Sequence, residues 1–204
     1  MKWWDERLLP RLVDRVCAFG GLDDLRRSAC EGLHGRVLEI GFGSGLNVEH
    51  YPPAVTEVVA VEPSDVAWRL AGRRLDHSPA PVERGGLDGQ RLPFPDASFD
   101  SALSTFTLCT IPDLSAALGE VHRVLRPGGE LHFVEHGLAP EPGVQRWQHR
   151  ITPVWKKAAG GCHLDRPIQE QLETAGLEVT EIERFFGTGP KPFAFFYLGY
   201  ATRP

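Results

Sequence analysis

A short glycine-rich segment is the first part of the sequence whose residue types suggest chemistry. Gly41, Gly43 and Gly45 form the pattern G-x-G-x-G directly after RVLEI at 36–40, a compact apolar run typical of a buried strand. Glycine lets the backbone turn sharply and approach a ligand closely, and a helix beginning near Leu46 would offer free N–H groups to an anionic group. A tight turn between a strand and a helix is the plain structural alternative.

The spacing narrows the kind of ligand that this segment would hold. The dinucleotide pattern G-x-G-x-x-G needs glycine at position 46, where the chain has leucine, and no Gly-Lys-Ser/Thr follows as a P-loop requires. Glu62 ends a second apolar run, TEVVAVE at 56–62. An acid there accepts hydrogen bonds from a ribose diol and repels a 2′-phosphate. The pattern therefore predicts an adenosine-type ligand with no phosphate on the 2′ oxygen.

Strand-like and helix-like segments alternate along the chain that must position these residues. Besides the helix after Leu46, helices are expected at 5–19, 22–33, 65–76, 114–125, 143–158 and 167–175. Strands are expected at 36–40, 56–62, 81–86, 99–105, 130–136, 177–185 and 193–202. The alternation predicts a mostly parallel sheet covered by helices, and the last two strands, with no clear helix between them, predict an antiparallel hairpin. In such a sheet a ligand lies beyond the carboxyl ends of the strands.

Composition and charge exclude several classes of protein. The chain has 204 residues with 22 glycines and 17 prolines, which is more turn-forming content than a helical bundle needs and lacks the period of collagen. Lys and Arg number 22 against 27 Asp and Glu, so the net charge of −5 disfavours a nucleic-acid partner. The strongly apolar stretch 193–201 is about half as long as a membrane helix. Asp5 and Glu6 stand where a signal peptide would be apolar. We therefore expect a cytoplasmic monomer or weak dimer with no integral membrane segment.

The four cysteines are far apart in the sequence. Cys17, Cys30, Cys109 and Cys162 form no C-x-x-C pair, and their spacing suits neither a zinc knuckle nor a small disulfide scaffold. We expect reduced thiols and no metal site.

Four segments within residues 36–136 together resemble the successive motifs of the class I S-adenosylmethionine-dependent methyltransferases. They are VLEIGFGSG, AVEPS, LDGQRLPFPDASFD and EVHRVLRPGG. The resemblance implies an α/β, Rossmann-like class I methyltransferase fold, with a mostly parallel seven-stranded sheet, a C-terminal antiparallel hairpin and helices on both faces. It also implies S-adenosyl-L-methionine as cofactor and S-adenosyl-L-homocysteine as product. We expect a single domain over 1–204, with an N-terminal helical lid at 1–34 and a substrate-side insertion at 137–166.

The same resemblance, carried over by position, implies a cofactor site. Its residues are Glu39, Gly41, Gly43, Gly45, Glu62, Pro63, Asp88, Gly89, Ser104, Thr105 and Phe106. The first four would surround the methionine half of the cofactor, Glu62 would bind the ribose, and the last three would line the methionine end. Asp88 and Gly89 would contact the adenine, although the family usually has Gly-Asp-Ala where this chain has Leu-Asp-Gly.

The flanking segments resemble a narrower group. WWDERLLPRLVD, STFTLCTIPD, FVEHG and GVQRWQHRITPVWKKAAGGCHLDRP are similar to bacterial phospholipid-type or unassigned small-molecule methyltransferases, whose relatives include animal thiol methyltransferases. This resemblance implies S-methylation of a small, fairly apolar thiol. N-methylation of a phospholipid head group and O- or C-methylation of a secondary metabolite or quinone stay open, as does a cofactor-binding regulator without turnover.

Methyl transfer from a sulfonium asks the protein mainly to position the partners, with a modest base for a thiol acceptor. The candidate catalytic residues are His136, at the end of an expected strand, and His149; both have a structural or solvent-facing alternative. The candidate substrate-binding residues are Trp3, Trp4, Cys109, Glu135, Trp147, His163 and Arg166. Each of these has a structural alternative. The tryptophans could pack helices onto the core, and Cys109 could be a buried inert thiol. Glu135 could orient His136, and Arg166 could pair with Asp165.

Overall fold

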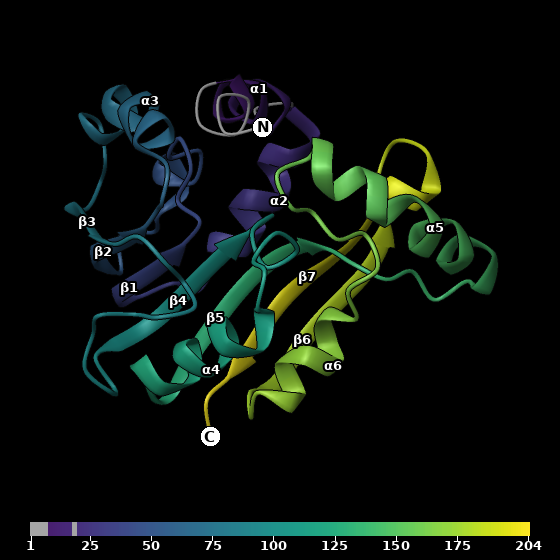
Figure 1. Ribbon diagram of the computed structural model, residues 1–204. Coiled ribbons are helices and arrows are strands. Elements are labelled where there is room, and N and C mark those ends of the chain that lie inside the picture. Colours follow the sequence, from purple (N-terminus) through teal and green to yellow (C-terminus); the bar gives the residue numbers. More distant parts are fainter. Residues whose placement is uncertain (1–7, 18–19) are drawn as a thin grey trace.

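The computed structural model describes residues 8–17 and 20–204, and its centre is one sheet of seven strands. The strands are β1 (Gly35–Ile40), β2 (Val55–Val61), β3 (Val82–Gly86), β4 (Phe99–Thr105), β5 (Leu125–His136), β6 (Glu178–Phe186) and β7 (Phe195–Thr202). Their order is β3-β2-β1-β4-β5-β7-β6 (Figure 1). The first five are parallel, and β7 runs antiparallel to both β5 and β6. The predicted sheet and its C-terminal hairpin are confirmed.

In the described residues, six α-helices and two short 3-10 helices precede the strands or lie between them. They are α1 (Leu9–Cys17), α2 (Gly20–Cys30), η2 (Val48–His50), α3 (Asp65–Leu75), α4 (Leu114–Val124), α5 (Pro142–Ala158), α6 (Ile168–Thr174) and η3 (Lys191–Phe193). Ser64 and Asp113 begin α3 and α4 as N-caps, since their side chains accept the N–H groups of Ala67 and Ala116. No helix in the described residues is long and apolar enough to cross a bilayer.

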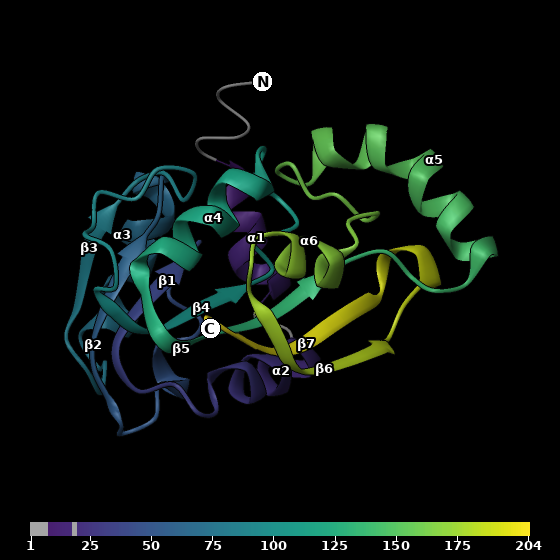
Figure 2. The same ribbon diagram turned by 90° about the horizontal axis from the view of Figure 1, so that it is seen from below.

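The core lies on both faces of the sheet, which explains the continuous apolar runs of the central strands. Leu38 and Ile40 of β1 pack on one face with residues of α4 and α6, whereas Val37 packs on the other face with residues of α2. Figure 2 shows α2 on one side of the strands and α4 and α6 on the other. Because α2 is part of this core, α1 is the described helix of the expected 1–34 lid that is left to cover a site.

The helix predicted to begin near Leu46 is absent, and this expectation was wrong. The chain makes turns and then only the three residues of η2. Pro52 and Pro53 follow at once, and proline removes a backbone donor and disfavours helical backbone in the residue before it. The glycine segment is therefore not backed by the positive end of a helix.

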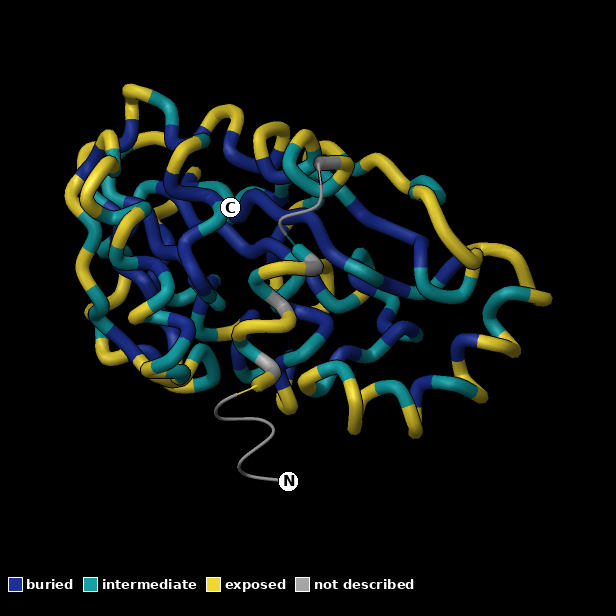
Figure 3. The backbone as a smooth tube through the Cα atoms, turned by 90° about the horizontal axis from the view of Figure 1, so that it is seen from above, coloured by how far each residue is buried: buried dark blue, intermediate teal, exposed yellow. Residues whose placement is uncertain are grey.

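Helix α5 belongs to the periphery. It contacts mainly the β6–β7 connection at η3, and many of its residues are exposed (Figure 3). Gln148 and Thr152 are its buried residues, while Trp147 and Val154 are exposed. Within the segment expected as a substrate-side insertion, α5 is thus the part that is largely exposed.

Candidate active site

The carboxyl ends of β1, β2 and β4 meet in one row. Ile40 pairs with Val61 on one side and with Ser104 on the other, so Gly41, Glu62 and Thr105 leave the sheet at the same level. The strand order reverses between β1 and β4. In open α/β sheets, the crevice at this switch point is where ligands bind.

The glycine segment crosses this edge in a conformation that side chains oppose. Gly41 has φ +74°, and a Cβ there would lie 2.0 Å from the hydroxyl oxygen of Thr107. Gly43 has φ +60°, but the nearest atom to a Cβ would be 3.8 Å away. Packing against the next loop therefore requires glycine at 41, whereas at 43 it keeps open space beside the backbone.

Glu62 is hydrogen-bonded to the same glycine segment. Its carboxylate accepts the N–H of Gly43 at 2.7 Å and that of Ser64 at 2.6 Å, and the residue is only 6% exposed. Burial raises the pKa of Glu62, and the two backbone hydrogen bonds oppose that rise. Pro63 beside it is exposed.

Glu39 is fully buried under the segment and lies within a polar network. It accepts hydrogen bonds from the amide of Asn47 at 2.9 Å and from the hydroxyl of Tyr51. Burial raises the pKa of Glu39 from its ordinary 4.5 to about 7, although both hydrogen bonds lower it. With its oxygens bonded inside the protein, Glu39 supports the loop from beneath.

Arg26 extends this network to strand β4. Its guanidinium donates to Asn47 at 3.0 Å and to the hydroxyl of Thr105 at 2.7 Å, and it lies 5.1 Å from the ring centroid of Phe106. The residue is 6% exposed. Sequence analysis missed Arg26 because it belongs to α2, outside every motif. A charged residue among the apolar positions of that helix was the one available signal.

Asp88 and Gly89, expected at the adenine, lie in the loop after β3. The Asp88 carboxylate is exposed and accepts both the side-chain and the backbone N–H of Gln90 at 2.9 Å. These hydrogen bonds lower the pKa of Asp88, so it stays ionised at neutral pH. A Cβ on Gly89 would approach Ile40 to 3.0 Å. Asp88 is thus a solvent-facing acceptor at the outer end of the row.

Glu135, expected as a substrate contact, is hydrogen-bonded within the protein. Glu135 is fully buried, and its carboxylate accepts Ser104 Oγ at 2.8 Å and the N–H groups of Thr107, Leu108 and Cys109 at 2.9 to 3.2 Å. These donors are all parts of the protein, so the oxygens are used internally. Glu135 fixes the loop after β4, and Phe106 enters that loop with φ +56°, a conformation uncommon for residues other than glycine.

Arg166, another expected substrate contact, is also hydrogen-bonded within the protein. Its guanidinium donates to the backbone carbonyl oxygens of Leu108 and Ile111, and it is 8% exposed. It therefore holds the 107–111 loop.

His136 ends β5 beside that loop. Its ring lies 5.6 Å from the ring of Phe106 and 4.7 Å from that of Phe196, measured between centroids. The fold brings the buried thiols of Cys109 and Cys162 next to it. The neighbouring Cys109 and, to a smaller extent, His136 lower the pKa of the Cys162 thiol. Cys162 was not singled out for the site, because in sequence it lies far from both.

The remaining candidates are not gathered at this edge. His149 is exposed and pairs with Asp165 at 2.9 Å, and His163 lies 3.9 Å from the same carboxylate. Trp147 is 57% exposed. Trp3 and Trp4 lie outside the described residues. Of the two candidate catalytic histidines, only His136 adjoins the row of strand ends.

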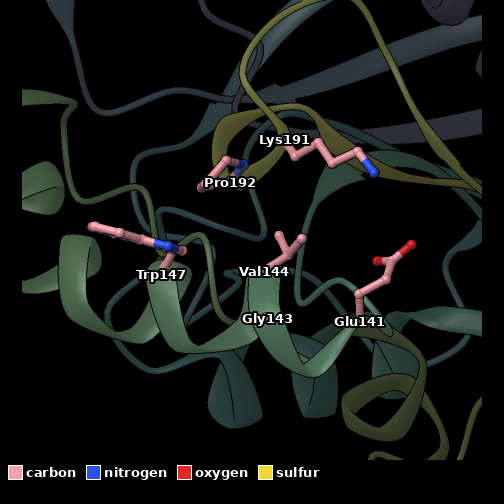
Figure 4. Close-up of a pocket in the computed structure, with 6 residues that line it drawn as sticks. All are labelled: Glu141, Gly143, Val144, Trp147, Lys191 and Pro192. Atoms are coloured by element: carbon pink, nitrogen blue, oxygen red, sulfur yellow. The ribbon is translucent and has the colours of Figure 1, made fainter.

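Trp147 instead lines a hollow of about 480 Å³ at the start of α5. Figure 4 shows Val144 and Trp147 on α5 and Glu141 just before it, across from Lys191 and Pro192 of the β6–β7 connection. None of the predicted cofactor residues lines this hollow.

Comparisons with known proteins agree with the geometry. A Methyltransferase domain family matches residues 38–133. The structure resembles that of an S-adenosylmethionine-dependent methyltransferase from Mesorhizobium loti, with a TM-score of 0.67, 18% identity, and coverage of 91% of this chain and 99% of that one. The fold is therefore that of the Rossmann-like methyltransferases.

Two curated relatives are similar along most of the chain. Thiol S-methyltransferase TMT1B of Rattus norvegicus is 32% identical over 189 residues, which is 89% of this chain and 72% of that protein. Phosphatidylethanolamine N-methyltransferase of Cereibacter sphaeroides is 30% identical over 156 residues, 72% of each chain. The chain belongs to the S-adenosylmethionine-dependent methyltransferases. It spans between 62% and 72% of the length of the thiol and phosphatidylethanolamine methyltransferases that it matches.

Proposed function

We propose that this enzyme transfers the methyl group of S-adenosyl-L-methionine to the sulfur of a small, fairly apolar thiol. In this proposal the cofactor lies along the row of strand ends, with its ribose on Glu62, its adenine near Asp88 and its methionine end near Phe106. Similarity to thiol S-methyltransferases over 89% of the chain is the observation that carries the choice of acceptor.

Chemistry of the site supports a thiol over a hydroxyl. A thiol with a pKa of about 8.5 needs little help to ionise, whereas an aliphatic hydroxyl needs a strong base. Glu135 is bonded to its own loop, so His136 is the titratable group of β5 that remains on the acceptor side. A single histidine suits a thiol.

Exposed apolar residues support an apolar acceptor. Leu8 and Leu12 of the N-terminal segment are 37% and 47% exposed, and Trp147 and Val154 of α5 are 57% and 73% exposed. Figure 1 places α1 and α5 on the side of the sheet where β4 and β5 end. We propose that these two helices flank the acceptor entrance, with α1 as the lid.

N-methylation of a phospholipid head group is the second candidate. The 30% identity to phosphatidylethanolamine N-methyltransferase favours it, and the same exposed apolar side chains would suit a lipid.

The test compares turnover on small acceptors that differ only in their nucleophilic atom, and on a phospholipid. Purified protein receives methyl-labelled S-adenosyl-L-methionine and, separately, an alkyl thiol, the amine and the alcohol of the same carbon skeleton, and vesicles containing phosphatidylethanolamine. Labelled thioether from the thiol alone supports the proposal. Label in the amine or the lipid, without thioether, overturns it.

A further inference from the structure

Three side chains with metal-binding atoms converge from three separate segments. Cys109 comes from the loop after β4, His136 from the end of β5, and Cys162 from the loop after α5. Their two sulfur atoms and one ring nitrogen all lie within 4.8 Å of one another. Both cysteines are buried and His136 is half-buried.

The two cysteine-bearing loops are tied together by contacts that do not involve sulfur. The N–H of His163 donates to the carbonyl of Cys109 at 2.8 Å, and Arg166 bonds the carbonyls of Leu108 and Ile111. Gly161 lies so close that a Cβ there would approach the carbonyl oxygen of Thr110 to 2.9 Å. The thiols are therefore brought together by a rigid main-chain arrangement.

A further hydrogen bond fixes Cys109 relative to His136. The N–H of Cys109 donates to the carboxylate of Glu135 at 3.2 Å, and Glu135 directly precedes His136 on β5. The three segments that carry the metal-binding atoms are thus held together by hydrogen bonds. A binding site needs its ligand residues to be held in place before the metal binds.

Two thiolates and one imidazole form a ligand set that suits zinc. Such sites are tetrahedral, with bonds of about 2.3 Å to sulfur and about 2.0 Å to nitrogen, so ligand atoms stand roughly 3.5 Å apart. Small side-chain rotations draw atoms within 4.8 Å into that geometry. Three protein ligands, instead of four, are typical of sites whose fourth position takes water or substrate.

We propose that Cys109, His136 and Cys162 bind one zinc ion, and that the thiol acceptor occupies its fourth position. The second half rests on the proposed function. His136 contacts Phe106 at the expected methionine end, which puts the fourth position on the acceptor side.

Atoms and charge are conserved in the proposed methyl transfer. The acceptor thiol loses its proton to solvent and binds zinc as a thiolate, which takes over the activation otherwise left to His136. A sulfur lone pair attacks the methyl carbon, the new S–C bond forms, and the C–S bond of the sulfonium breaks with its electron pair staying on the cofactor sulfur. The products are the methyl thioether, S-adenosyl-L-homocysteine and one proton.

Metal content tests the site without reference to turnover. The protein is purified in a thiol-free reductant, loaded with zinc, desalted and analysed for metal. We expect one zinc per chain in the parent and in Cys30→Ala, a buried cysteine in a different part of the core, and a loss of about tenfold in Cys109→Ser and in Cys162→Ser. Parent protein holding less than about a tenth of an equivalent, or Cys162→Ser that keeps full zinc, overturns the site.

Two further measurements guard against misfolded variants and separate the two proposals. In the parent, chelation must lower the melting temperature and zinc must restore it, since a bound metal stabilises the native state. Replacing zinc by cobalt(II) must give a thiolate charge-transfer band that changes when the alkyl thiol is added. Methylation of thiols at the same rate by metal-free protein would overturn the role of zinc in the transfer and leave the proposed function standing. A zinc-loaded protein that does not methylate thiols would overturn the proposed function and leave the zinc site standing.

Discussion

The carboxylate of Glu62 accepts the backbone N–H of Gly43 at 2.7 Å, which joins the end of β2 to the glycine segment that follows β1. One residue thus shapes the loop and, in our proposal, offers its remaining lone pairs to the ribose. Removing it changes both the loop and the binding of the cofactor.

We expect Glu62→Ala to weaken S-adenosyl-L-homocysteine binding strongly. Hydrogen bonds to a charged group contribute about 1.5–3 kcal/mol, so the Kd should rise roughly 10- to 100-fold. Isothermal titration calorimetry measures it. Asp65→Ala, which removes an exposed carboxylate three residues further on, is the matched control and should bind like the parent. Equal affinity of both variants would remove Glu62 from the ribose site.

Gly41 and Gly43 should respond differently to the same substitution. Gly41→Ala places a Cβ against Thr107 in a left-handed conformation, so we expect a loss of about 3 kcal/mol or more in the free energy of unfolding. Gly43→Ala has room, so its cost should stay near the roughly 1–2 kcal/mol of the left-handed backbone. Urea denaturation measures both.

Cofactor affinity completes this comparison. Because the open space beside Gly43 is where we place the cofactor, Gly43→Ala should bind S-adenosyl-L-homocysteine at least about tenfold more weakly while remaining folded. A folded Gly43→Ala variant with unchanged affinity would move the cofactor away from this loop.

Glu39 should make stability depend on pH. Its pKa is raised from 4.5 to about 7, so the folded protein binds this proton more tightly than the unfolded chain does. The contribution of Glu39 to the free energy of unfolding therefore falls as pH rises from about 4.5 to about 7, by about 3 kcal/mol in total.

Comparison with Glu39→Gln isolates that contribution. Denaturation of both proteins across this pH window should show the variant gaining stability relative to the parent as pH rises, and the difference should level off above about pH 7. Parallel curves would mean that folding leaves the pKa of Glu39 unchanged.

We expect Arg166 to stabilise the 107–111 loop and not to recognise the charge of the acceptor. A lysine in its place cannot donate in two directions from a planar group, so Arg166→Lys should lose about 1.5–3 kcal/mol of stability. The readout that separates the two roles is the ratio of KM for an anionic and a neutral thiol. An unchanged ratio agrees with the structure, whereas a selective rise for the anionic thiol would restore Arg166 as a substrate contact.

Local patterns were enough to predict the element order and the sheet. Strand and helix periodicity placed most segments within a few residues of where they lie. The G-x-G-x-G segment and Glu62 were found because each directly follows or ends a buried strand, and parallel strands bring such ends to one edge. The single lost helix, after Leu46, was stopped by the two prolines that follow η2.

Side-chain partners were decided by the tertiary structure. Glu135 and Arg166 look like substrate residues in the sequence, yet folding turns both onto the loop after β4. Arg26 reaches Thr105 from another element altogether. The grouping of Cys109, His136 and Cys162 is the clearest case, since no two of them share a segment. A sequence determines which residues stand at strand ends, because that order is local. Which of them meet depends on how the connecting loops pack, and those contacts join residues far apart in the chain.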